Sequence, residues 1–179
     1  MSEYRSFERC VVCRSRNNLK IYDGDFEETL LLNTLYMTIM FPIEMRQSKG
    51  TVKAKKIVSY LEDYGLVNTN GNEFDPDTIL RCLRNALAHF NVEVESFDKK
   101  VSSIKLWAIN RPNKTVCKPE HACNNPQCIP KQYATNKNGE ICTFVFTMSE
   151  LREFTHFVID HVLDRLPSNI CKSCPHKST

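Results

Sequence analysis

The stretch DPDTILRCLRNALAHFN, residues 75–91, decides how the chain folds. It opens with Asp75 before Pro76, and an aspartate N-cap followed by a proline at the first helical position is a strong helix start. The apolar residues that follow recur at helical spacing and cluster on one face: Ile79, Leu83, Leu87 and Phe90, flanked by Leu80 and Ala86. This spacing predicts a helix that runs to about Asn91 and buries that face in a core.

Two helices are predicted before this stretch. Apolar residues at helical spacing begin after Phe26, and Pro42 is expected to end or bend that helix near Phe41, with a kinked continuation to Met45 as the alternative. The second helix is predicted over residues 51–64, with Gly65 as its stop signal. If neighbouring helices pack antiparallel, the first helix starts at the end of the bundle where the last one finishes.

After the central helix the periodicity changes. Residues 103–110 alternate between apolar and polar side chains, and residues 140–147 are rich in β-branched and aromatic ones, so both segments are predicted strands. The long segment between them, residues 111–139, carries four prolines and three cysteines. A capping box at Thr147 and Glu150 opens a last helix that stops at Pro167. The predicted fold class is therefore all-α, a four-helix bundle with a β-hairpin between the third and fourth helices.

Composition limits the function without identifying it. The chain has 179 residues, 41% of them hydrophobic and 25% charged, with a net charge of +3. This length suits one domain, at residues 23–166, which includes the hairpin and the Cys/Pro-rich loop at 103–147. A Cys-containing N-terminal appendage precedes it at residues 1–22, and a Cys-containing tail follows it at residues 167–179. The apolar stretch 30–43 is too short and too polar to cross a bilayer, and the N-terminus lacks a secretory signal, so a cytoplasmic location without membrane contact is expected. A charge of +3 alone does not indicate nucleic-acid binding.

The polar face of the central helix carries the residues with chemistry. Arg81, Asn85 and His89 are spaced i, i+4 and i+8 and form one row, with Arg84 at the edge of the same face. Arginine binds a phosphate bidentately, histidine exchanges a proton near neutral pH, and asparagine can orient either partner. This set, without carboxylate ligands, suits metal-independent RNA cleavage. The common alternative for so short a pattern is a solvated helix face.

The segment LRNALAHFNVE resembles the active motif of HEPN-domain ribonucleases, in which an arginine, a polar residue and a histidine lie on one core helix. Together with LLLNTLYMTIMFPIEM in the first predicted helix, it is similar to a plasmid- and defence-associated family of HEPN nucleases, over roughly residues 26–166. The resemblance implies a HEPN-like helical bundle in which Arg84 binds the scissile phosphate, His89 transfers a proton and Asn85 positions one of them. Arg81 lies outside the family motif and is added, from the helical wheel, as an RNA contact.

The resemblance also implies a biological setting. The expected activity is that of an endoribonuclease that leaves a 2′,3′-cyclic phosphate. The chain is expected to act as a homodimer and as a toxin or anti-phage defence effector, with an antitoxin or regulatory protein as a candidate partner. No cofactor is expected for catalysis. Two alternatives stay open: a non-catalytic HEPN-like module that binds RNA or nucleotide, and an adaptor organised by zinc.

Nine cysteines are unusual for a chain of this kind, and without an export signal they indicate thiols or metal rather than disulfides. Two Cys-x-x-Cys pairs near the ends of the chain predict a structural zinc site, with free or redox-active cysteines as alternatives: Cys10, Cys13, Cys171 and Cys174. His176 could replace one thiolate. A rival set lies in the long loop: Cys117, His121, Cys123 and Cys128. Cys82 and Cys142 are expected to face the core.

Overall fold

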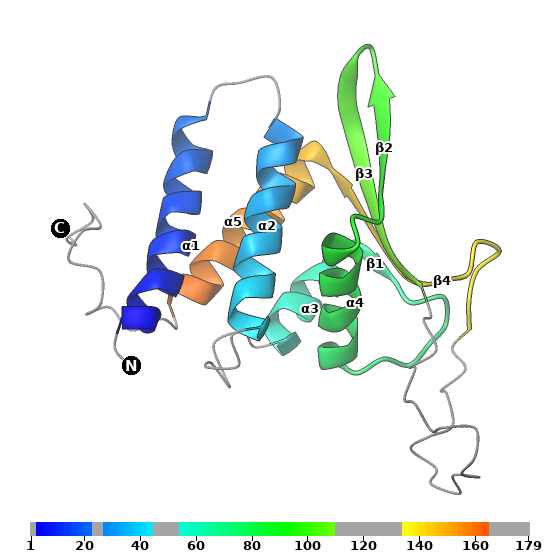
Figure 1. Ribbon diagram of the computed structural model, residues 1–179. Helices are drawn as coiled ribbons and strands as arrows, with labels where there is room; N and C mark the ends of the chain where they lie inside the picture. The colour runs from blue at the N-terminus through cyan, green and yellow to red at the C-terminus, as the bar shows by residue number, and fades with distance from the viewer. Residues whose placement is uncertain (1–2, 23–26, 45–53, 110–133, 165–179) are drawn as a thin grey trace, which may run out of the picture.

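A four-stranded antiparallel sheet forms one side of the protein in the computed structural model, which describes residues 3–22, 27–44, 54–109 and 134–164. The strand order is β1-β4-β3-β2. The strands are β1 (Val67–Asn68), β2 (Val92–Phe97), β3 (Lys100–Ile109) and β4 (Glu140–Thr147). The β2–β3 hairpin is long, and Figure 1 shows it extending away from the helix that precedes it.

One face of the sheet forms part of the core. Every second residue of β3 from Ile104 to Ala108 is buried, and each lies opposite a buried residue of β4: Cys142, Phe144 or Phe146. This is the alternation predicted for residues 103–110, and the predicted pairing of the two segments is confirmed. Burying large apolar side chains on one face of both strands fixes their register, because a slip of one residue would turn that face to solvent.

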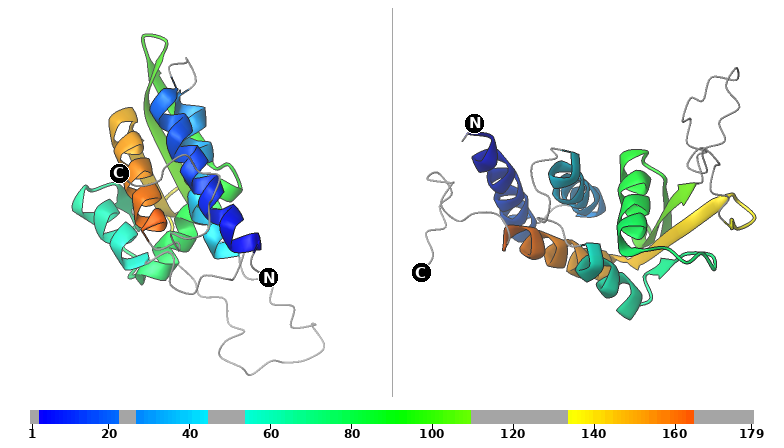
Figure 2. Two further views of the ribbon diagram at one scale, coloured as in Figure 1. Left: turned by 90° about the vertical axis from the view of Figure 1, so that its left-hand side faces the viewer. Right: turned by 90° about the horizontal axis from the view of Figure 1, so that it is seen from below.

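The described residues form five helices, of which α4 and α5 make the main contacts with the sheet. They are α1 (Glu3–Ile21), α2 (Glu27–Glu44), α3 (Ala54–Asp63), α4 (Pro76–Ala88) and α5 (Met148–Leu163). Figure 2 shows α1 beside α2, with α5 crossing both, and α3 beside α4. Leu35 of α2, Ile57 of α3, Leu83 of α4 and Phe154 of α5 are fully buried in one continuous core with the sheet.

The all-α prediction is wrong, because the four-stranded antiparallel sheet makes this a mixed α and β fold. Two strands were not predicted. In β2 the sequence VEVESF places glutamates beside valines on an exposed edge, and β1 has only two residues. Such edge strands form because they pair with a buried neighbour, so their own apolar pattern is weak.

The N-terminal segment also differs from the expected appendage. Residues 3–21 form a 19-residue helix, α1, and its Val12 and Cys13 are buried in the same core as the other helices. Arg16 of α1 donates to the Asp160 carboxylate of α5 at 3.4 Å. Few of its side chains are apolar, so the helix is stabilised by its contacts with α2 and α5 rather than by a strong apolar stripe of its own.

Some helix boundaries follow the predicted signals, but α5 ends at Leu163, with Asp164 as its C-cap, instead of continuing to Pro167. Helix α2 continues past Pro42 to Glu44, as the alternative of a continued helix allowed. The capping box of α5 is present, because the Thr147 hydroxyl accepts from the Glu150 N–H at 3.3 Å and the Glu150 carboxylate accepts from the Thr147 N–H at 2.8 Å. Among the helices of the described residues, none is long and apolar enough to span a membrane.

Candidate active site

Helix α4 begins as its sequence predicts. Asp75 is the N-cap, and its carboxylate accepts from the Thr78 N–H at 2.8 Å and from the Thr78 hydroxyl at 2.9 Å. These hydrogen bonds lower the pKa of Asp75, because they stabilise its ionised form. Arg81 donates from Nη2 to the same Thr78 hydroxyl at 3.1 Å. Arg81, the first residue of the polar row, is therefore hydrogen-bonded to the first turn of α4.

The predicted polar residues share one face of α4, away from the core. Arg81 and His89 are exposed, and Arg84 and Asn85, between them, are half-buried. The opposite face holds the buried side chains of the helix: Ile79, Leu80, Cys82, Leu83, Ala86 and Leu87. Since residues four apart are neighbours on a helix surface, Arg81, Asn85 and His89 form one row that solvent reaches, with Arg84 alongside.

The end of α4 differs from the prediction, and the difference concerns the site. The helix ends at Ala88, with His89 as its C-cap, instead of running to Asn91. The Phe90 N–H bonds the Leu87 carbonyl at 3.1 Å and the Asn91 N–H bonds the Ala86 carbonyl at 2.9 Å. Phe90 has a φ of 51°, in the left-handed region. These bonds and this residue together form a Schellman motif with phenylalanine at the position that glycine usually takes.

Phe90 does not join the apolar face that the helical spacing suggested. Its side chain is 73% exposed, because the chain leaves the helical path at His89. No glycine marks the turn, so the sequence carries no ordinary signal for this C-cap. Sequence reasoning therefore missed that an aromatic side chain stands in solvent directly after His89.

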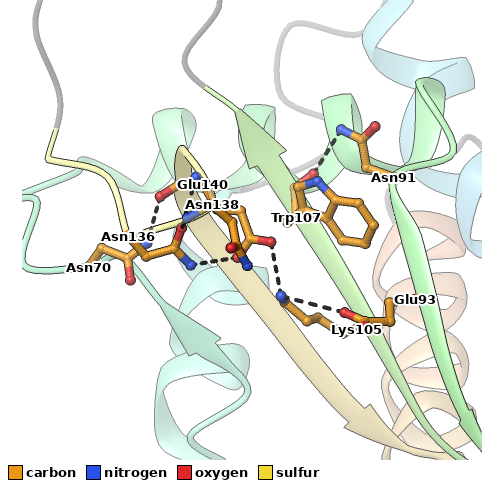
Figure 3. Close-up of polar contacts among 8 residues, drawn as sticks. All are labelled: Asn70, Asn91, Glu93, Lys105, Trp107, Asn136, Asn138 and Glu140. Atoms are coloured by element: carbon orange, nitrogen blue, oxygen red, sulfur yellow. Dashed lines mark hydrogen bonds and ion pairs between the residues drawn. The ribbon is translucent and has the colours of Figure 1, made fainter.

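Asn91 connects this helix end to the sheet by hydrogen bonds. Its Nδ2 donates to the Trp107 carbonyl of β3 at 3.0 Å (Figure 3). The Trp107 N–H donates in turn to the Asn91 carbonyl at 3.3 Å. Both bonds join the segment after α4 to a strand whose neighbouring residues, Leu106 and Ala108, are buried in the core. The backbone that carries His89 is thereby held from both sides, by the helix and by β3.

A second polar cluster lies on the sheet and is internally satisfied. The Glu140 carboxylate, 5% exposed, accepts from Lys105 Nζ at 2.9 Å and from Asn136 Nδ2 at 2.7 Å, and the Glu140 carbonyl accepts from Asn70 Nδ2 at 2.9 Å (Figure 3). Lys105 also lies 3.7 Å from Glu93. Burial raises the pKa of Glu140, but the hydrogen bonds from Lys105 and Asn136 outweigh it and hold the pKa below its ordinary value. An ionised carboxylate with these partners joins β4 to β3 and to the segment before β4, and so stabilises the sheet rather than transferring protons.

The expectation that two cysteines face the core is confirmed. Cys82 and Cys142 are both buried, and their thiols hydrogen-bond each other across α4 and β4. That bond, together with burial, raises the pKa of Cys142. Both thiols therefore act as part of the core.

The predicted zinc sites are not tested by this structure. Cys13 of α1 is buried in the core. The other three residues of the terminal set lie outside the described side chains: Cys10, Cys171 and Cys174. The same holds for the whole loop set: Cys117, His121, Cys123 and Cys128. Within the part of the chain that the structure describes, no group of three or more metal-ligating side chains occurs. The terminal zinc site stays a prediction.

A family model described as HEPN pEK499 p136 matches residues 1–118, more than half of the chain. The match includes α1 and the whole of α4, so it begins before the expected resemblance at residues 26–166, and it ends before β4 and α5. Neither a curated protein nor a solved structure matches the chain.

Proposed function

The chain belongs to the HEPN pEK499 p136 family, as its motif suggested, and from this premise we propose that it is a metal-independent endoribonuclease. Family membership indicates a nuclease or another RNA-related function. The finer proposal is supported by one observation above all. The half-buried Arg84 and Asn85 and the exposed C-cap His89 lie on the side of α4 opposite its buried side chains, and the end of that helix is hydrogen-bonded to the sheet at Asn91.

The proposed reaction uses the RNA's own 2′-hydroxyl. This hydroxyl attacks the adjacent phosphorus as it loses its proton, the bond from phosphorus to the 5′-oxygen breaks, and the leaving 5′-oxygen gains a proton. The products are a 2′,3′-cyclic phosphate and a 5′-hydroxyl. DNA lacks the attacking group, so this route would leave DNA intact.

Each residue of the face has a role that its chemistry supports. The Arg84 guanidinium, which stays charged and can bind two phosphate oxygens at once, would stabilise the negative charge that grows on the phosphate. His89, exposed at the C-cap, can take a proton from the 2′-hydroxyl or give one to the leaving oxygen. Asn85, one turn before His89, would orient the histidine or the substrate. Arg81 would contact the RNA backbone further along the same row.

We propose a homodimer because the reaction needs more catalytic groups than one chain supplies at this site. One Arg84 and one His89 must otherwise supply a base, an acid and charge stabilisation, whereas a second copy of the chain would bring another pair to the same phosphate. The role of a toxin or anti-phage defence effector, with an antitoxin or regulatory partner, is proposed on the family resemblance alone.

The test is cleavage of RNA in the presence of EDTA. We expect the wild type to cleave and both Arg84→Ala and His89→Ala to lose activity by about 100-fold or more, the typical loss when a general acid–base or charge-stabilising group is removed. Two control variants, Arg14→Ala on α1 and His156→Gln on α5, remove the same residue types far from this face and should cleave as the wild type does. Unchanged cleavage by His89→Ala would refute the mechanism, and RNA binding without cleavage would indicate a non-catalytic RNA-binding module instead.

A further inference from the structure

Phe90 occupies a position that its own chemistry disfavours. Its φ of 51° lies in the left-handed region, where a bulky side chain is crowded and glycine or asparagine is the usual residue. The ring is also 73% exposed, so it gains no burial in compensation. Residues held in this way are concentrated at functional sites, where the surrounding structure enforces the conformation.

The surroundings of Phe90 do enforce it. The N–H groups of Phe90 and Asn91 are bonded to carbonyls in the last turn of α4, and the Asn91 side chain is bonded to Trp107 of β3. The residue before it is His89, whose Cα is about 3.8 Å away along a trans peptide bond. The fold thus fixes the backbone of a residue with an exposed aromatic ring, directly after the histidine of the proposed active site.

Structural explanations for an aromatic ring here are weak. The C-cap requires only a residue that tolerates the left-handed conformation, and asparagine would meet that need at lower cost. The ring adds nothing to the core, since it is mostly in solvent. Phe97 is even more exposed, at 81%, but it lies at the tip of the β2–β3 hairpin, away from the polar face of α4.

We propose that Phe90 is a stacking platform for an unpaired nucleobase next to the scissile phosphate, so that the substrate is single-stranded RNA. Aromatic side chains bind single strands because every base has a π face, whereas in a duplex the bases are stacked on each other and unavailable. The inference rests on the proposed function for the identity of the neighbouring phosphate site. Arg84 and Arg81 would hold the backbone while Phe90 holds a base.

The test measures binding separately from cleavage. The probe is a short single-stranded 2′-O-methyl oligoribonucleotide, in which the attacking hydroxyl is blocked, and its affinity is compared with that of the same strand in a duplex. Phe90→Leu keeps an apolar side chain but removes the π face, and Phe90→Trp restores it. Phe90→Asn suits the left-handed backbone, so it keeps the fold if the leucine variant does not. Phe97→Leu is the matched control.

We expect Phe90→Leu and Phe90→Asn to bind the single strand about ten-fold more weakly, the cost of one lost base–aromatic stack, with duplex binding unchanged. Phe90→Trp and Phe97→Leu should bind as the wild type does, and Phe90→Asn should melt at or above the wild-type temperature. Wild-type affinity in both weakened variants would overturn the inference, and so would equal losses for single strand and duplex. A change of oligomeric state in Phe90→Asn on sedimentation would overturn it too, because the ring would then be a protein contact.

The two proposals can fail separately. If the wild type binds the single strand through Phe90 but cleaves no RNA, the endoribonuclease is refuted and the stacking role stands. If the wild type cleaves RNA while the Phe90 variants bind the probe and cleave as it does, the stacking role alone is refuted.

Discussion

Replacing Asn91 by alanine should separate the stability of the fold from the geometry of the site. The substitution removes one hydrogen bond, from Nδ2 to the Trp107 carbonyl at 3.0 Å, and leaves the backbone bond between the two residues in place. One neutral, half-buried hydrogen bond contributes about 1 kcal/mol to stability. A domain of ordinary stability, about 5–15 kcal/mol, therefore stays folded. What changes is the anchor of the segment that carries His89.

The activity of Asn91→Ala should fall further than its stability does. A shift of about 1 Å in a reacting group can cost on the order of 100-fold in rate, and we expect RNA cleavage to drop by about 10- to 100-fold. The measurements are urea unfolding followed by circular dichroism, and initial cleavage rates at a temperature where both proteins are fully folded.

Asn72 provides the control for this prediction. Its side chain bonds the Thr69 and Ala134 carbonyls at 2.7 and 2.9 Å and accepts from the Ala134 N–H at 2.8 Å, so these bonds join the segments before α4 and β4 and do not involve the residues of the polar face. Asn72→Ala loses more hydrogen bonds than Asn91→Ala, so it should be the less stable variant and yet cleave RNA at the wild-type rate. Wild-type cleavage by Asn91→Ala, or an equal loss in Asn72→Ala, would refute the reasoning.

Three further predictions concern the fold. Glu140→Ala should lower the free energy of unfolding by about 2–3 kcal/mol, because it removes charge-assisted hydrogen bonding from Lys105 to a buried carboxylate; a loss within the error of urea unfolding would contradict this. Thr147→Ala removes the N-cap of α5 and should cost about 1 kcal/mol, measured as a lower melting temperature. The hydrogen bond from Arg152 lowers the pKa of Glu27. The pair therefore stabilises the protein at pH values above the ordinary pKa of a glutamate, and this stabilisation is lost as the pH falls through the lowered pKa of Glu27. Because the Arg152 side chain is about half exposed and that of Glu27 about a third, solvent screens the pair and the effect is at most about 1 kcal/mol. Glu27→Gln should flatten the stability profile in that acidic window.

Local signals predicted the parts of the fold that depend on short stretches of chain. The Asp75-Pro76 start of α4 and the capping box at Thr147 need only a few neighbouring residues, and both are present. The alternation around Leu106 predicted β3 for the same reason. These features follow from side-chain period and capping chemistry, which the sequence displays directly.

The missed elements depend on contacts with other elements rather than on a pattern of their own. Strand β2 has glutamates between its valines and forms by pairing with β3, the next strand, and α1 buries Val12 in the core that it shares with α2 and α5. The polar face of α4 was predictable because its residues follow one helix, but its end was not. Phe90 matches the apolar period of α4, and only the structure shows that the helix has already ended at Ala88, with His89 as C-cap and no glycine after it.

The most direct test of the central claim is the chemistry of the ends that cleavage leaves. The wild type is incubated with RNA in EDTA and the fragments are identified by mass spectrometry, beside the Arg84→Ala and His89→Ala variants. The account predicts fragments with 2′,3′-cyclic phosphate and 5′-hydroxyl ends, absent from both variants and from a substrate with a 2′-deoxy sugar at the cleavage position. Fragments with 3′-hydroxyl and 5′-phosphate ends, or equal cleavage of the 2′-deoxy substrate, would contradict it.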